Sequence, residues 1–104
     1  MQKGSETGFT GKDELAERYE LRLFVNGTSP LSLRAISNIK LVLEEYLPGL
    51  YDLEVIDAHQ QPLLVQSEDV TAVPMLIKKT PAPRKRLIGD MSDKQKVLRG
   101  LGLT

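Results

Sequence analysis

Few residues in this chain combine in a way that could do chemistry. His59 is the one imidazole among 104 residues, and Asp57 stands two positions before it. A carboxylate and an imidazole can share a proton or bind a metal, but two ligands do not complete a metal site, and a lone loop histidine is more often solvated than catalytic. Cysteine is absent, which excludes disulfides, thiolate metal centres and dithiol redox chemistry. The sequence therefore predicts no catalytic residue, no metal site and no cofactor.

The turn around Gly27 has the position of a phosphate-binding loop, between an expected strand and an expected helix. It contains one glycine and lacks the lysine that such a loop requires, so the P-loop motif is not present. A helix N-terminus can attract an anion without that motif. An ordinary capped turn is nevertheless the simpler interpretation.

The densest group of charges lies in residues 78–86, where five cations surround two prolines. Such a segment could dock on an acidic protein surface, contact nucleic acid, or protect a sheet edge from aggregation. The segment has no aromatic residue to stack on bases, and the net charge of the chain is zero. Nucleic-acid binding is therefore the weakest of the three interpretations, and protein docking and edge protection stay equally open.

The 14 basic and 14 acidic residues are unevenly distributed along the chain. Residues 1–69 hold 12 acidic and 6 basic residues, whereas residues 70–104 hold 2 and 8. This asymmetry is compatible with head-to-tail contacts between subunits, with a charged partner, or with surface charge that has no partner. No apolar run approaches the roughly 18–20 residues that cross a bilayer, and the first residues are too polar for a secretion signal. We expect a cytoplasmic protein without membrane contact.

Hydrophobic periodicity predicts one α/β domain over residues 19–104, preceded by a flexible tail over residues 1–18 that holds few apolar side chains. The first half of the domain reads as a strand, a helix capped by Ser29 with Pro30 at its first position, and a second strand. A helix between two strands makes them parallel, with a right-handed crossover. The expected bounds are 19–25 and 51–57 for the strands and 31–47 for the helix.

The second half of the domain is expected to contain a short helix, an antiparallel pair of strands and a closing helix. Pro74 cannot donate to a ladder, so it must lie at the start or the edge of its strand. Ser92 and Gln95 have the spacing of a capping box, which predicts Ser92 as the N-cap of the closing helix. The expected bounds are 61–67 for the short helix, 70–77 and 84–90 for the strands, and 78–83 for the turn between them.

Six segments carry a resemblance to a known family: Tyr19–Val25, Gly27–Pro30, Ser32–Ala35, Glu54–Asp57, Ala72–Leu76 and Ile88–Asp93. In this order and spacing they resemble the KaiB family, which comprises a cyanobacterial circadian clock protein and its bacterial homologues. The resemblance implies a thioredoxin-like βαβαββα fold and a binding protein rather than an enzyme. Thr28–Leu31 would then stand at the place of a CxxC redox motif.

The resemblance also implies a second arrangement of the same chain. In KaiB proteins the C-terminal half rearranges into a βαββααβ order, and the chain assembles as a tetramer. Propensity cannot choose between two packings of one sequence that differ by a few kcal/mol, so both arrangements, and a dimer, stay open. X-Pro bonds exchange between cis and trans over tens to hundreds of seconds, which makes Pro74, Pro81 and Pro83 the fold-switch candidates. Pro74 opens the strand at which thioredoxin-like folds keep a cis bond, and three ordinary trans prolines in turns are the alternative.

The resemblance implies docking on the ATPase KaiC and capture of KaiA. Arg34, Lys85 and Arg86 are similar in position to cations that the family uses for partner docking. Two positions depart from cyanobacterial members, which usually carry lysine at the position of Asp69 and an acidic residue at that of Gly102. These departures leave room for a stress-adaptation module that acts without a full clock. A thioredoxin-like enzyme that acts on a small molecule through His59 is the alternative from another class.

Overall fold

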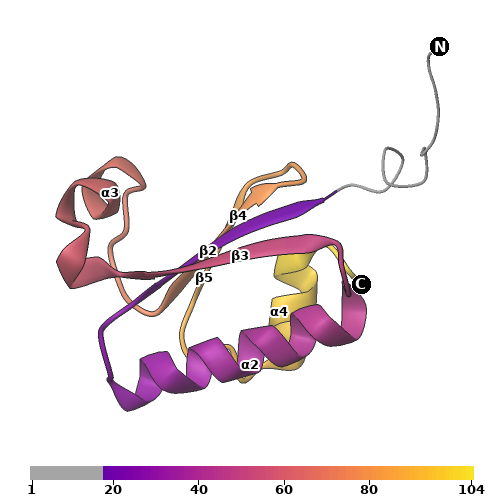
Figure 1. Cartoon of the computed structure of the whole chain (residues 1–104). Coiled ribbons are helices and arrows are strands. Elements are labelled where there is room, and N and C mark those ends of the chain that lie inside the picture. Colours follow the sequence, from indigo (N-terminus) through magenta and orange to yellow (C-terminus); the bar gives the residue numbers. More distant parts are fainter. Residues whose placement is uncertain (1–17) are drawn as a thin grey trace, which may run out of the picture.

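A four-stranded sheet organises the part of the chain that the computed structural model describes, residues 18–104 (Figure 1). The tail expected over residues 1–18 lies outside the described residues, apart from Arg18. The Arg18 guanidinium donates to Asp52 Oδ2 at 2.9 Å and so contacts the sheet. In spatial order the strands are β3 (Tyr51–Asp57), β2 (Tyr19–Val25), β4 (Met75–Thr80) and β5 (Lys85–Ile88).

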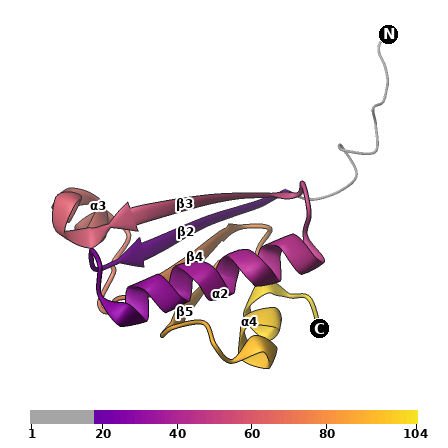
Figure 2. The ribbon, with the colours of Figure 1, turned by 60° about the horizontal axis from the view of Figure 1, so that its bottom comes forward.

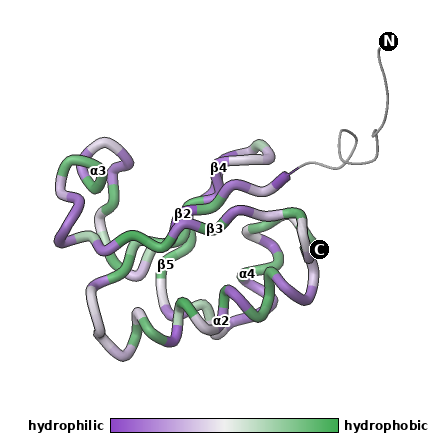
Figure 3. Tube along the Cα trace, in the orientation of Figure 1, coloured by the Kyte–Doolittle hydropathy of each residue, from purple (hydrophilic) through white to green (hydrophobic). Residues whose placement is uncertain are grey.

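The first half of the domain forms as its periodicity predicts. β2 and β3 pair in parallel along their whole length, and helix α2 (Pro30–Tyr46) connects them. Ser29 Oγ accepts the backbone N–H of Ser32 at 3.2 Å, and Pro30 occupies the first turn, where its missing N–H has no helical partner to lose. The hydrophobic positions of α2 recur at helical spacing and alternate with polar ones in Figure 3.

The second half confirms the expected order of elements but corrects their bounds. The 3-10 turn η1 (Ala58–Gln60) leads into α3 (Pro62–Ser67), and β4 pairs antiparallel with both β2 and β5. The strand predicted over 70–77 instead begins at Met75, immediately after Pro74, and continues to Thr80. Pairing with β2 explains the shift, because Lys78 lies opposite Leu21 and Thr80 opposite Glu20.

The closing helix α4 (Lys94–Leu101) is capped by Asp93 rather than by the predicted Ser92. Asp93 Oδ1 accepts the backbone N–H of Lys96 at 3.1 Å, while the backbone N–H of Ser92 donates to Asp90 Oδ1 at 3.0 Å. The local turn at Asp90 therefore engages Ser92 and moves the cap one residue onward. Gly100 allows α4 to pack closely on the sheet, since a Cβ there would lie 2.7 Å from Leu87 Cδ1.

The two faces of the sheet carry separate apolar clusters of unequal size. Leu21 and Leu23 of β2 point to the larger cluster beneath α2 and α4, whereas Phe24 points to the opposite face. Figures 1 and 2 show α2 and α4 on one side of the sheet and α3 on the other. The smaller cluster consists of four buried residues, with partly buried neighbours from α3 and the loop that follows it: Phe24, Ile56, Met75 and Ile77.

The observed order of elements is βαβαββα, which confirms the predicted α/β fold. Among residues 18–104, no helix has the length and apolar character needed to cross a bilayer. The peptide bonds that precede Pro74, Pro81 and Pro83, the three prolines singled out in the sequence, are all cis.

Candidate functional site

The three cations expected to dock a partner lie on different surfaces. Arg34 is on α2, where its Nε donates to Asp90 Oδ2 at 3.4 Å. Arg86 lies opposite Ile77 in the ladder and therefore shares the face of the smaller apolar cluster, and its Nη1 donates to the Asp69 carbonyl at 2.8 Å. Lys85 lies on the opposite face, because successive side chains of a strand point to alternate faces of the sheet. The structure therefore brings none of the three side chains together with another.

The basic segment 78–86 is largely engaged within the fold. Lys78 is buried, with its Nζ 5.9 Å from the centre of the Tyr19 ring. Lys79 and Arg84 both bind Glu68. The exposed cations that remain for contact with a partner are Lys85 and Arg86, on β5 at the edge of the sheet, so the edge-protection interpretation also fits their position.

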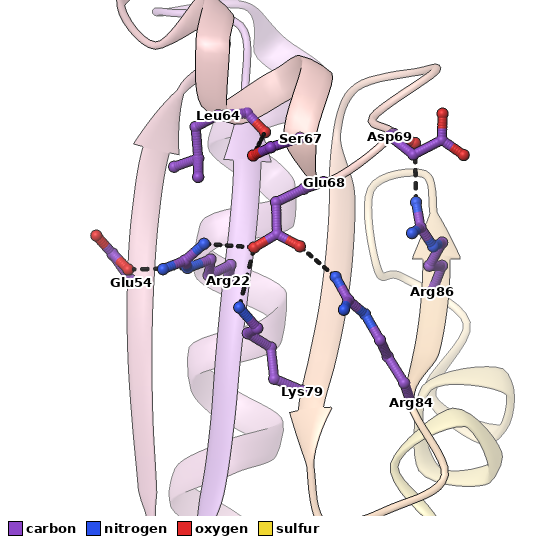
Figure 4. A network of polar contacts seen from close by, with 9 residues as sticks. All are labelled: Arg22, Glu54, Leu64, Ser67, Glu68, Asp69, Lys79, Arg84 and Arg86. Carbon is purple, nitrogen blue, oxygen red and sulfur yellow. Dashed lines mark hydrogen bonds and ion pairs between the residues drawn. The ribbon is translucent and has the colours of Figure 1, made fainter.

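A buried carboxylate organises the charged part of the sheet face that carries α3 (Figure 4). Glu68 directly follows α3 and is 7% exposed. Its Oε2 accepts hydrogen bonds from Arg22 Nη1 and, at 3.0 Å, from Lys79 Nζ, and its Oε1 accepts one from Arg84 Nη2. Arg22 also donates to the exposed Glu54 at 3.2 Å. We call these five residues the Glu68 cluster.

Charge explains why the Glu68 carboxylate can be buried. Burial by itself raises the pKa of Glu68, but the hydrogen bonds and charges of Lys79 and Arg84 outweigh it, and the net pKa is lowered. The cluster contains three cations and two carboxylates, so it keeps an excess of positive charge. The charged groups join three strands and the end of α3, and they therefore fix α3 to the sheet.

Sequence reasoning did not identify the Glu68 cluster. Arg22 stands at an alternating polar position of β2, which shows only that it faces away from the main core. Glu68 lies in a polar stretch after a weak helix, and nothing in that pattern indicates burial. The excess of cations in 78–86 was a usable signal, since buried cations require an acidic partner.

The residues considered for chemistry occupy exposed or structural positions. Asp57 Oδ1 accepts the backbone N–H of His59 at 2.9 Å and so caps η1, while the His59 side chain is exposed. Within residues 18–104, no three histidine, aspartate or glutamate side chains lie close enough together to hold a metal ion. Thr28–Leu31 forms the turn and first residues of α2, where Ser29 has its capping role.

The fold and the N-terminus of α2 define a thioredoxin-like domain whose redox position lacks thiols. Chloroplastic thioredoxin z has a similar structure, with a TM-score of 0.65, 16% identity, and coverage of 100% of this chain and 99% of that chain. The N-terminal domain of Synechococcus elongatus SasA is more similar, with a TM-score of 0.70, 28% identity, and coverage of 97% and 96%. The thioredoxin similarity shows the fold alone.

Sequence comparison gives the family. Residues 22–103 match the KaiB domain. The circadian clock oscillator protein KaiB of Prochlorococcus marinus strain MED4 is 46% identical over 85 residues, which cover 82% of this chain and 79% of that protein. The protein of the same name from Picosynechococcus is 44% identical over 89 residues, 86% of each chain. The chain belongs to the KaiB family, which supports a regulatory role in a circadian clock.

Proposed function

We propose that this protein is a non-enzymatic regulator that docks on a KaiC-like ATPase, modulates its phosphorylation cycle and captures a KaiA-like protein. The observation that carries the proposal is the match of residues 22–103 to the KaiB domain, together with relatives named circadian clock oscillator proteins. The absence of cysteine and the exposed, unpartnered imidazole of His59 within the described residues favour binding over catalysis. The same proposal places the protein in the cytoplasm.

Exposed groups near α3 support a docking surface on that side of the sheet. Leu63 on α3 is 79% exposed, which makes it an apolar anchor that a partner could cover. Arg86 lies beside the segment that follows α3, through its hydrogen bond to the Asp69 carbonyl. Arg86, on the same face, would steer an acidic partner surface toward this anchor, and Lys85, on the opposite face of β5, would extend the positive charge along the sheet edge. Arg34, on α2, would contribute to a separate contact.

The proposal includes the second arrangement of the family, in which the C-terminal half adopts a βαββααβ order and the chain forms a tetramer. Pro74, Pro81 and Pro83 remain the fold-switch candidates of this proposal. The Glu68 cluster supports the idea that α3 is held by a distinct set of contacts, because it joins α3 to β2 and β4 through charge rather than through a large apolar core.

The runner-up function is a stress-adaptation module that acts without a complete clock. Asp69 and Gly102 favour it, because both differ from the residues expected of cyanobacterial members. In this structure Asp69 has a φ of 58° directly after α3, and Gly102 has a φ of 77° at the C-cap of α4. Both positions are therefore helix ends, where a change of residue alters the local turn and charge.

A binding experiment separates the two functions. The full chain is mixed with a KaiC-type ATPase in the presence of ATP and analysed by size-exclusion chromatography with light scattering. The proposed function predicts a complex that contains both proteins and a change in the phosphorylation of the ATPase. If no complex forms over a wide concentration range and a long incubation, the clock assignment fails and the stress-adaptation function is favoured.

A further inference from the structure

The sheet ends in an open strand on each side, and the two edges carry opposite charge. Within residues 18–104, no strand pairs with the outer side of β3 or of β5. β3 contains three acidic residues and no basic one, whereas residues 84–86, at the start of β5, are all basic. An open edge presents backbone N–H and C=O groups that can pair with another chain. The charges therefore decide which chain is accepted.

The sign of the charges disfavours pairing between identical edges. Two β3 edges would place carboxylates side by side, and two β5 edges would place cations side by side, both of which are destabilising. The β3 edge of one copy and the β5 edge of another attract each other. The partner that fits both open edges of this chain is accordingly a second copy in a head-to-tail arrangement.

We propose that β5 of one copy pairs in parallel with β3 of the next copy, with Arg84 opposite Asp52 and Arg86 opposite Glu54. β3 is parallel to β2, and β4 is antiparallel to both β2 and β5, so β3 and β5 run in the same direction. Placing the two edges side by side thus continues the sheet and keeps α2 and α4 of both copies on one side of it and α3 of both copies on the other. This inference does not depend on the proposed docking to an ATPase.

The register follows from which face each side chain occupies. Glu54 contacts Arg22 on the face that carries the Glu68 cluster, and Arg86 lies on that same face opposite Ile77. In the proposed register Val55, 41% exposed, lies opposite Leu87, and Ile88, 51% exposed, lies opposite Ile56. Both exposed apolar side chains would therefore be covered by apolar neighbours. A slip of one residue would move every charge to the wrong face.

The charges that would meet already have partners within the chain but are still accessible to a second one. The Arg84 side chain is 45% exposed although it binds Glu68, and Arg86 is exposed although it donates to the Asp69 carbonyl. The side chains of Asp52 and Glu54 are 66% and 62% exposed although they pair with Arg18 and Arg22. A carboxylate has two oxygens and can accept from two cations at once. β5 is four residues long, so the ladder between copies is short. The association is consequently weak and depends on ionic strength.

Sedimentation velocity over a series of protein concentrations tests the association. The wild-type chain should form dimers and longer head-to-tail species at an ionic strength of about 0.01 M and dissociate at about 1 M, where the Debye length falls from about 30 Å to about 3 Å. Glu54→Lys and Arg86→Glu should each weaken association by about tenfold or more. Mixing the two variants should restore it, because the lysine introduced into the β3 edge of one chain then meets the glutamate introduced into the β5 edge of the other.

A matched control separates the edge contact from net charge. Lys40→Glu makes the same change in net charge as Arg86→Glu but lies on the exposed surface of α2, away from both edges. It should leave association unchanged. Circular dichroism of each variant checks that the fold is kept. Association that Lys40→Glu weakens as much as Arg86→Glu does would overturn the proposal.

Disulfide trapping tests the register. The chain has no cysteine, so single substitutions give unambiguous cross-links. A Val55→Cys chain mixed with a Leu87→Cys chain should form a mixed disulfide, because directly opposite residues bring their Cβ atoms to about 5 Å. A Lys85→Cys chain is the control, because its cysteine lies on the same face of β5 but two residues before position 87. It should react more slowly with the Val55→Cys chain. Equal rates for the two mixtures, or a salt-insensitive tetramer as the sole oligomer, would refute the head-to-tail contact.

Discussion

Replacing Glu68 by glutamine tests whether one buried carboxylate fixes α3 to the sheet. The substitution keeps the shape of the side chain and one acceptor oxygen but removes the charge that three cations share. Hydrogen bonds to charged groups contribute about 1.5–3 kcal/mol each. Arg22, Lys79 and Arg84 are partly exposed and can recover hydration, so the three contributions do not add.

We expect Glu68→Gln to lower the free energy of unfolding by about 2 kcal/mol at neutral pH. For a domain of this size, that loss corresponds to a fall in Tm of about 8–16 °C. Urea unfolding followed by circular dichroism measures the free energy, and light scattering confirms that wild type and variant are compared in the same oligomeric state. Glu54→Gln is the control, since Glu54 shares Arg22 but is exposed, and it should cost at most about 1 kcal/mol.

The difference in unfolding free energy between wild type and Glu68→Gln should depend on pH. The pKa of Glu68 is lower in the folded chain than in the unfolded chain, so the unfolded state takes up the proton first as the pH falls. The stabilisation by Glu68 is therefore complete above its ordinary pKa and is lost as the pH falls through the folded value. The difference between wild type and Glu68→Gln should shrink below about pH 4. A Glu68→Gln variant as stable as Glu54→Gln at pH 7 would refute the reasoning.

Three further substitutions test other contacts. Gly100→Ala should cost about 1–3 kcal/mol in thermal unfolding, because its Cβ would overlap the Leu87 side chain, and this cost should be smaller when it is measured in a Leu87→Ala background. Asp93→Ala should cost about 1 kcal/mol by removing the cap of α4, whereas Asp93→Asn should change stability by a few tenths. Lys85→Glu should weaken binding to a KaiC-type ATPase and flatten its dependence on salt, with Lys40→Glu as the control; equal affinities would leave edge protection as the role of Lys85.

The elements that local pattern determines could be predicted from the sequence. The helix of α2 follows from its apolar spacing and its Ser29 cap, and β2 and β3 follow from alternation. The bounds of β4 could not be predicted in the same way, because Lys78 and Lys79 belong to a basic stretch with two prolines whose composition predicts a turn. Pairing with β2, the Tyr19 ring and the distant Glu68 keeps them in the strand.

The candidate site was harder to predict because its contacts join residues far apart in the chain. Arg22 and Glu68 are separated by 46 positions, and no local pattern relates them. The three docking cations came from family resemblance, which gives positions but not which face of the sheet each side chain occupies. For Lys85 and Arg86, the face is determined by the ladder that pairs Lys85 with Lys78 and Arg86 with Ile77.

The unequal size of the two apolar clusters has a consequence for local unfolding. The face beneath α2 and α4 buries most of the core, whereas the face that carries α3 buries four apolar residues and relies on Glu68 for the rest of its attachment. The segment from η1 to the start of β4 can therefore open while β2, α2 and β3 stay folded. Its amide hydrogens should exchange with solvent through this partial opening, at a lower free energy than the amides of β2 and faster still when salt screens the Glu68 cluster.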